Sequence, residues 1–78
     1  MNKSSEEKIK NVMSIVFDIP INQINDGTSA KTTISWDSLR HMNLIIGLEE
    51  EFEIEFNDDD IGNLLSFSSI NSYINKLI

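Results

Sequence analysis

One serine in the chain lies where a hydroxyl group is suited to carry a phosphate. Ser38 follows Asp37 and precedes a stretch of apolar residues with helical spacing. An aspartate in that place is typical of a helix N-cap, because its carboxylate accepts hydrogen bonds from backbone N–H groups that the first turn leaves without partners. Ser38 is then the first helical residue, beside free N–H groups and the positive end of the helix dipole, where phosphate groups bind. We therefore take Ser38 as the candidate functional residue.

The helix predicted behind this motif, from Asp37 to Glu51 or Phe52, has apolar residues on two sides. At roughly 100° per residue, the first stripe consists of Leu44, Ile45, Leu48 and Phe52. The second stripe, on nearly the opposite side, consists of Leu39, Met42 and Ile46. A helix that packs by one face needs only the first stripe. The second lies on the side from which Ser38 can be reached, and it is bordered by Glu49, Glu50 and Glu53. We interpret the second stripe and these acids as a partner-binding face.

The motif and the residues behind it resemble the acyl carrier proteins. The resemblance is carried by Asp37-Ser38-Leu39, Leu48-Glu49-Glu50-Glu51-Phe52, Ile54, Asp58-Asp59-Asp60 and Tyr73-Ile74, and it runs from about Lys8 to the C-terminus. In that family the serine of an Asp-Ser-Leu motif carries a 4′-phosphopantetheine arm. The aspartate contributes to recognition by the transferase that attaches the arm. The resemblance therefore implies covalent 4′-phosphopantetheine on Ser38 and transferase recognition at Asp37.

The function that the resemblance implies is that of a carrier with no catalysis of its own. Acyl intermediates would be held as thioesters and presented to enzymes of fatty acid biosynthesis, polyketide synthesis or a specialised acyl-transfer pathway. The implied partners are a phosphopantetheinyl transferase and acyl-activating, condensing or acyl-transferring enzymes with basic docking patches. An aminoacyl or D-alanyl carrier would use Ser38 in the same way. The alternative from a different class is a helical adaptor that binds a basic partner and bears no arm.

Three residues near the motif depart from the family's pattern. Members that serve general fatty acid synthesis tend to have acidic residues just after the motif, where this chain has Arg40 and Asn43. Trp36 stands before Asp37, where the family usually has a small residue. These departures favour a specialised pathway with its own partner enzymes.

The net charge of −7 lies entirely in the second half of the chain. Lysines and acids balance within residues 1–36, whereas residues 37–78 contain nine acids against Arg40 and Lys76. This distribution argues against nucleic acid as a partner, because nucleic-acid-binding proteins concentrate lysine and arginine. It favours partners with basic patches, which the acidic surface would attract by electrostatic steering.

The composition predicts a cytoplasmic monomer. No apolar run approaches the roughly 18 residues of a membrane span, and the polar N-terminus does not resemble a signal peptide. We therefore expect no membrane insertion. The chain has no cysteine, so disulfides and thiolate metal sites are excluded. Any thiol that a carrier of this sequence presents must come from a cofactor.

Helical periodicity predicts an all-α fold. Apolar residues from Ile9 to Phe17 recur at i, i+3, i+4, i+7 and i+8, and Pro20 ends this helix near Asp18. After the helix at Asp37, a short third helix is predicted with Asn57 to Asp60 at its start and with Ile61, Leu64 and Leu65 within it. A last helix starts at Ser66 or Ser68 and continues to Ile78. We predict one acyl-carrier-type domain over residues 1–78, a small antiparallel bundle of three main helices and one short helix.

The segment between the first two main helices is predicted to be a long packed loop. It has no clear period, but it contains four isoleucines that we interpret as apolar anchors: Ile19, Ile21, Ile24 and Ile34. Within the second helix, Gly47 costs about 0.5–1 kcal/mol relative to alanine. Its presence indicates close approach by another element.

Two other clusters suggest chemistry that the sequence does not support. His41 lies three residues after Ser38, but no third group orients it and nothing suggests an oxyanion hole, so we reject an esterase and predict no enzymatic activity. The run Asp58-Asp59-Asp60 lacks the glycine and glutamate that an EF-hand loop requires. We therefore expect no specific metal site.

Overall fold

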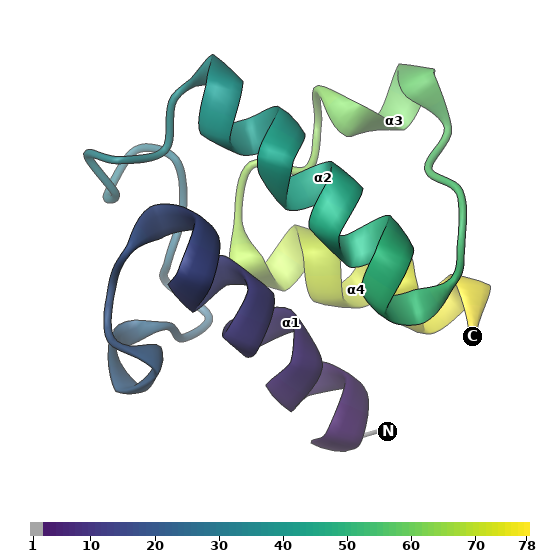
Figure 1. The fold of residues 1–78 in the computed structure, drawn as a ribbon, viewed down its shortest axis with the longest axis horizontal. Helices are drawn as coiled ribbons and strands as arrows, with labels where there is room; N and C mark the ends of the chain where they lie inside the picture. The colour runs from purple at the N-terminus through teal and green to yellow at the C-terminus, as the bar shows by residue number, and fades with distance from the viewer. Residues whose placement is uncertain (1–2) are drawn as a thin grey trace.

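A computed structural model describes residues 3–78, with side chains from Ser5 onward. In this part of the chain the elements are α1 (Lys3–Phe17), a short 3-10 helix η1 (Ile21–Gln23), α2 (Ser38–Phe52), α3 (Asp58–Ile61) and α4 (Phe67–Leu77). Figure 1 shows α1 running against both α2 and α4, with the long first loop at one end of the bundle. The described chain contains no strand. The predicted all-α architecture of three main helices and one short helix is confirmed.

Left-handed residues follow α1 and α2, and side-chain caps mark the starts of α3 and α4. Asp18 follows α1 in the left-handed conformation, with φ at 57°, and Glu53 ends α2 in the same way at 55°. Asn57 caps α3 by accepting the backbone N–H of Asp59. Ser66 caps α4 through a reciprocal pair of hydrogen bonds with Ser69. The starts of α3 and α4 therefore occur where a capping side chain places them.

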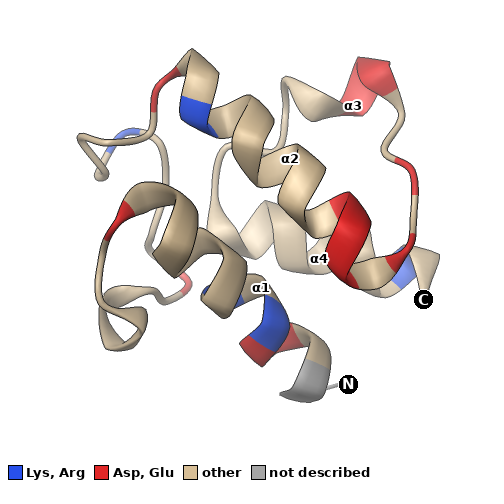
Figure 2. Cartoon of the chain, in the orientation of Figure 1, with Lys and Arg blue, Asp and Glu red and all other residues tan. Residues whose placement is uncertain are grey.

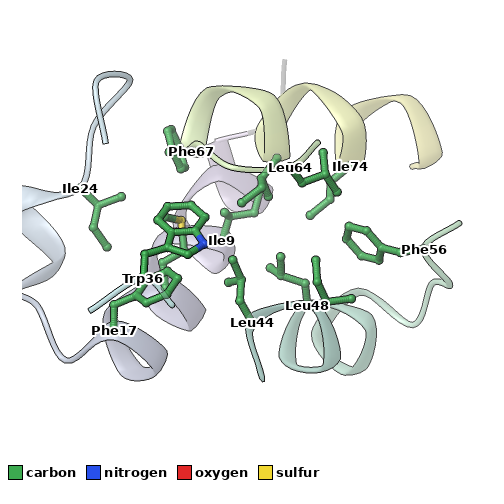
Figure 3. Close-up of a cluster of buried hydrophobic side chains, with 13 residues drawn as sticks. Ile9, Phe17, Ile24, Trp36, Leu44, Leu48, Phe56, Leu64, Phe67 and Ile74 are labelled. Carbon is green, nitrogen blue, oxygen red and sulfur yellow. The ribbon is translucent and has the colours of Figure 1, made fainter. Parts of the chain in front are cut away.

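The core lies between α1, α2 and α4 and draws further side chains from the connections (Figure 3). Its buried apolar members are Ile9, Met13, Phe17, Ile24, Trp36, Leu44, Ile45, Leu48, Phe56, Leu64, Phe67, Ile70 and Ile74. This set contains three residues of the first stripe of α2, and Phe52 packs against it while half-buried. The sequence-based assignment of that stripe to the core is confirmed.

Gly47 lies at a close contact between α1 and α2. A Cβ atom built on this glycine would lie 3.0 Å from Cγ1 of Val12 in α1, which is tighter than ordinary van der Waals contact. The small residue therefore allows the two helices to approach, as the sequence predicted. The two helices form the most extensive packing contact in the described chain.

The long loop is fixed to the start of α4 by backbone hydrogen bonds. Ser29 and Ser66 form an isolated β-bridge, the N–H of Ala30 donates to the carbonyl of Leu65 at 2.8 Å, and the N–H of Phe67 donates to Thr28. The prediction of a packed loop holds. Two of its four predicted anchors are confirmed, since Ile24 is buried and the half-buried Ile19 packs against the core. The other two were wrong, because Ile34 is fully exposed and Ile21 is 41% exposed.

The third helix is shorter than predicted. It ends at Ile61, and Gly62 follows as its C-cap, so Leu64 and Leu65 lie in the connection to α4. Gly62 and Asn63 both disfavour further helix, which explains the early end. Leu64 is buried, whereas Leu65 is 45% exposed and faces the start of α2 across a pocket. Because α3 ends early, Leu65 lies near Ser38, and both residues line the same pocket.

Candidate functional site

The first turn of α2 is fixed to the last turn of α1. The hydroxyl of Ser35 donates to the carbonyl of Phe17 at 2.9 Å, and Nη1 of Arg40 lies 3.5 Å from the carbonyl of Val16. The last turn of α1 has no basic residue of its own, so the Arg40 guanidinium supplies positive charge where the helix dipole is negative. These contacts hold both sides of the Asp37-Ser38 motif in place.

Ser38 is the first residue of α2, and Asp37 is its N-cap. The Asp37 backbone is extended, and its Oδ1 accepts the N–H of Arg40 at 2.8 Å. Both residues are exposed, and among the described residues from Ser5 to Ile78 none forms a hydrogen bond with the Ser38 hydroxyl. The expected N-cap at Asp37 is therefore present. The Ser38 hydroxyl is accessible to another molecule, beside the positive end of a helix of 15 residues.

A hydrogen-bonded chain of three residues lies behind the motif. Nε1 of Trp36 donates to Nδ1 of His41 at 3.0 Å, and Nε2 of His41 lies 2.8 Å from the carbonyl of Ile61. Because an indole N–H can only donate, Nδ1 accepts and Nε2 carries the proton that is donated to Ile61. The ring of Trp36 also stacks on Phe17, with 4.6 Å between the centroids (Figure 3). These two hydrogen bonds thus join the long loop, α2 and α3.

These hydrogen bonds explain the roles of the His41 and Trp36 side chains. Both ring nitrogens of His41 have protein partners, and the residue is buried, so it cannot act as a base for Ser38. The sequence-based preference for a packing role is confirmed. Trp36 was noticed only as a departure from the family's pattern. The structure shows it as a core residue that needs a hydrogen-bond acceptor for its indole, and His41 five residues later supplies one.

A pocket of about 340 Å³ opens beside Ser38. Its lining comes from the loop, the start of α2 and the connection before α4, and it consists of Ala30, Trp36, Asp37, Ser38, His41 and Leu65. A larger hollow of about 700 Å³ lies under the long loop and is bordered by Arg40, but Ser38 does not line it. The smaller pocket is thus the one connected to the candidate residue. Sequence reasoning did not find Leu65, because it placed this leucine within a helix.

The second stripe of α2 is exposed. Leu39 is 72% exposed, Ile46 50% and Met42 46%, although all three are large apolar residues. Figure 2 shows acidic residues gathered at the C-terminal end of α2, in the following connection and on α3. Glu50 and Glu53 are exposed there. The second stripe and its acidic border therefore lie together on the surface, on the side of α2 that does not pack against the core.

Glu49 differs from the other two predicted border acids. It is half-buried, and its Oε2 accepts the backbone N–H of Phe56 at 2.9 Å. The carboxylate therefore fixes the connection that follows α2. This structural role was not visible in the sequence, because it depends on a left-handed turn at Glu53 that brings the chain back.

The described side chains, Ser5 to Ile78, include no group of three histidines, cysteines or acids placed to hold a metal ion. In particular, Asp60 accepts the hydroxyl of Tyr73 at 3.0 Å and so is engaged within the fold. In the same part of the chain, no helix has the length and apolar character needed to cross a membrane.

Comparison with known proteins identifies the family. Over 71 residues the chain is 37% identical to the acyl carrier protein of Buchnera aphidicola subsp. Schizaphis graminum, an alignment that covers 91% of this chain and 90% of the relative. It is 33% identical to the acyl carrier protein of Buchnera aphidicola subsp. Baizongia pistaciae, covering 94% of both, and 29% identical to that of Nitratidesulfovibrio vulgaris strain DP4, covering 94% and 96%. No family model matches the chain. With this similarity over nearly its whole length, the chain belongs to the acyl carrier protein family, whose members are carriers and not enzymes.

Proposed function

We propose that Ser38 carries a 4′-phosphopantetheine arm and that the chain transports acyl groups on it. The observation that supports this most directly is the exposed Ser38 hydroxyl at the N-terminus of α2, directly after the Asp37 cap. Attachment requires an accessible primary hydroxyl, and the resulting phosphodiester would gain from the free N–H groups of the first turn. The residues present therefore fit the group.

The chemistry that the arm supplies is a thiol, which holds an acyl group as a thioester. The chain contains no cysteine and cannot supply this thiol itself. During attachment, the Ser38 oxygen would form a bond to the phosphorus of coenzyme A that bears the pantetheine. The phosphoanhydride bond would break, the nucleotide half would leave, and the hydroxyl proton would be released. We assign Asp37 a second role in recognition by the transferase that performs this step.

The exposed face of α2 is proposed as the docking surface for that transferase and for the enzymes that load and unload the carrier. Leu39, Met42 and Ile46 would provide apolar anchors, since a few such residues carry most of the energy of an interface. Glu50, Glu53 and the exposed part of Glu49 would meet basic patches on the partners. Such charges mainly raise the rate of association and select the orientation.

We further propose that the cargo is an acyl group of fatty acid, polyketide or specialised metabolism, and that the protein acts as a monomer in the cytoplasm. The three relatives compared above are named acyl carrier protein, which favours acyl over aminoacyl cargo. Arg40 is directed to the end of α1 and has a structural role there. Asn43 is exposed, so the first half of the docking surface lacks acids after Asp37. This difference favours a specialised set of partners.

The test is the intact mass of the protein after incubation with coenzyme A and a promiscuous phosphopantetheinyl transferase. We expect a gain of one phosphopantetheine for the wild type and no gain for Ser38→Ala. The matched control is Ser68→Ala, because Ser68 is also an exposed serine in the first turn of a helix. This variant should be modified like the wild type.

An unmodified wild type under conditions that modify another carrier would contradict the proposal and favour the adaptor without an arm. A modified Ser38→Ala protein would show that the arm is attached elsewhere. Analysis of the thioester recovered from native cells then distinguishes acyl from aminoacyl cargo.

A further inference from the structure

The two ends of α2 differ in charge. Residues 49–60, which span the end of this helix and most of α3, contain eight acids and no lysine or arginine. Within residues 28–41, which lead into the helix and form its first turn, the charged residues are Lys31, Asp37 and Arg40. Figure 2 shows a basic position at the start of α2 and acidic positions at its other end. A partner surface of uniformly positive charge would therefore match one end of α2 and oppose Arg40 at the other.

We infer that the enzyme that loads the arm presents an acidic side chain to Arg40, in the hollow under the long loop. This acid would be additional to the basic residues proposed for the far end of α2. The inference rests on the proposed attachment at Ser38. It goes further in naming the chemistry of the partner at a part of the surface away from the acids of α2.

Most of the hydrogen-bonding capacity of Arg40 is unused within the fold. A guanidinium has five N–H donors, and its contact here is that of Nη1 with the carbonyl of Val16 at 3.5 Å. This distance exceeds the range of about 2.7–3.2 Å of ordinary N–H···O hydrogen bonds. Within the described side chains, from Ser5 to Ile78, no carboxylate lies within ion-pair distance of the guanidinium. Arg40 is nevertheless half-buried, so its position is restricted while its donors remain available to a carboxylate.

The hollow that Arg40 borders is held open by the loop itself. Two of its lining hydroxyls are bound within the fold, because Thr28 donates to the carbonyl of Gln23 and Ser35 donates to the carbonyl of Phe17. The shape of the hollow is therefore fixed by contacts that do not require a ligand. Its volume of about 700 Å³ lies in the range of pockets that admit small ligands. An acidic side chain and its neighbour fit within it.

Two other residues in the lining define the partner further. Ile34 is a fully exposed large apolar residue there, so an apolar neighbour of the acid would gain by covering it. Asp18 is exposed in the same lining and would repel a carboxylate on its side. The incoming acid is therefore directed toward Arg40. The partner segment that fits is an acidic residue beside an apolar one.

An enzyme that docks at the start of α2 covers this region. A standard interface buries about 800 Å² on each partner, which is roughly a sixth of the 5029 Å² surface of this protein. Arg40 follows Ser38 by two residues in the first turn of α2, and one turn rises only about 5.4 Å. An interface that includes this turn therefore brings the partner against Arg40. A carboxylate on the partner would strengthen binding there, and a positive charge would weaken it.

The test measures the effect of one charge reversal on two enzymes. The first is a promiscuous phosphopantetheinyl transferase with a basic docking patch. The second is the loading enzyme, purified from native cells by its ability to acylate the arm-bearing protein. Arg40→Glu should raise kcat/KM several-fold with the transferase, because it removes a repulsion, and lower it roughly tenfold with the loading enzyme, because it places two acids together. Effects of opposite sign cannot come from a loss of folding, which would lower both rates.

Two further variants control for general effects. Lys31→Glu makes the same change of charge at an exposed lysine of the loop that does not line the hollow. It should change either rate by less than about twofold. Arg40→Gln removes the charge without adding an acid and should slow loading by about threefold. Thermal unfolding shows which variants are folded, and Arg40→Gln gives the result on its own if Arg40→Glu is not.

The contact itself is identified by carbodiimide coupling of Arg40→Lys to the loading enzyme. The new amine and a partner carboxylate condense to an amide, and the carbodiimide takes up the water that is lost. We expect fragmentation mass spectrometry to find position 40 joined to an aspartate or glutamate of the enzyme. The wild type has no amine at this position and is the control. Coupling through other lysines of the carrier but not through position 40 would overturn the inference.

The kinetic outcomes are equally decisive. Loading that is unchanged or faster in the Arg40 variants would overturn the inference, as would a loss no larger than that of Lys31→Glu. A folded Arg40→Glu protein that is slower with both enzymes would also overturn it, since the loss would then follow from the start of α2 and not from the charge of the partner. Failure of the wild type to gain the arm would contradict the proposed function itself, whereas the other outcomes leave that function in place.

Discussion

The two faces of α2 contain the same kinds of residue but lie in opposite environments, one buried and one exposed. Leu44, Ile45 and Leu48 are at most 2% exposed, while Leu39, Met42 and Ile46 are at least 46% exposed. The second set cannot be explained by the stability of the fold, because α1, α4 and the connections already cover the first. Large apolar side chains kept in solvent beside the proposed attachment residue favour an interaction surface. The contrast shows that folding buries one side of the helix and leaves the other in solvent, where we propose that partners bind.

The strongest test of this contrast is on the buried face. Leu48→Ala should lower the free energy of unfolding by roughly 2–5 kcal/mol, because the side chain is fully buried and its removal leaves a cavity. For a domain of this size that is a large part of the total stability. Chemical unfolding measures the loss. The fraction that stays folded should still accept the arm at the wild-type rate, and a specific loss of arm transfer would contradict the division of roles.

A second test concerns the one histidine on the buried face. His41→Ala should cost about 1–3 kcal/mol, because it leaves the buried indole N–H of Trp36 without its partner and removes one of the two hydrogen bonds to the Ile61 carbonyl. Asn43→Ala, two residues along on the exposed face, is the control and should change the stability little. Urea unfolding followed by the fluorescence of Trp36 measures both. Equal stability of the two variants would show that the hydrogen-bonded chain does not contribute to the fold.

On the exposed face, Met42→Ala should separate function from stability. Its cost should be well under the 2–5 kcal/mol of a buried methionine, because nearly half of the side chain is already in water. The transfer of the arm to Ser38 should nevertheless slow several-fold, since an apolar anchor of the docking surface is lost. Thermal unfolding and transferase kinetics are compared on the same sample. A destabilisation equal to that of Leu48→Ala would place Met42 in the core and remove the basis for this docking surface.

The smallest effect is expected at the acidic border of the exposed face. Glu50→Lys should leave stability nearly unchanged, slow the association with a basic partner and weaken the dependence of that rate on salt. Glu7→Lys in α1 makes the same change of charge at another exposed glutamate and is the control. Stopped-flow binding at two salt concentrations distinguishes them. If both variants slow association equally, net charge and not the face of α2 steers the partner.

The sequence predicted most of the fold because the relevant signals are local. Caps at Asp37, Asn57 and Ser66 and the periodic apolar residues of three helices depend only on neighbours along the chain. Both stripes of α2 followed from helical geometry, and the structure places each as that geometry requires. The Asp37-Ser38 motif could be located for the same reason.

What the sequence could not predict depends on contacts between distant segments. Ile34 was taken as an anchor, but a loop without a period gives no direction for its side chains, and this one points into solvent. Leu65 was placed in a helix that in fact ends at Ile61, so its place beside Ser38 was missed. The partnership of Trp36 and His41 with Ile61 required the path of the chain through α3. Of these residues, Trp36, His41 and Leu65 line the pocket beside Ser38.

The central claim is that the arm is joined to Ser38, at the edge of the face that folding leaves free. Its most direct test is fragmentation mass spectrometry of the modified wild-type protein, with the added phosphopantetheine located on one residue. We predict that the added mass is on Ser38 and is absent from Ser35, three residues earlier, whose hydroxyl is bound to the carbonyl of Phe17. Localisation to Ser35, or to any serine outside the start of α2, would contradict the account.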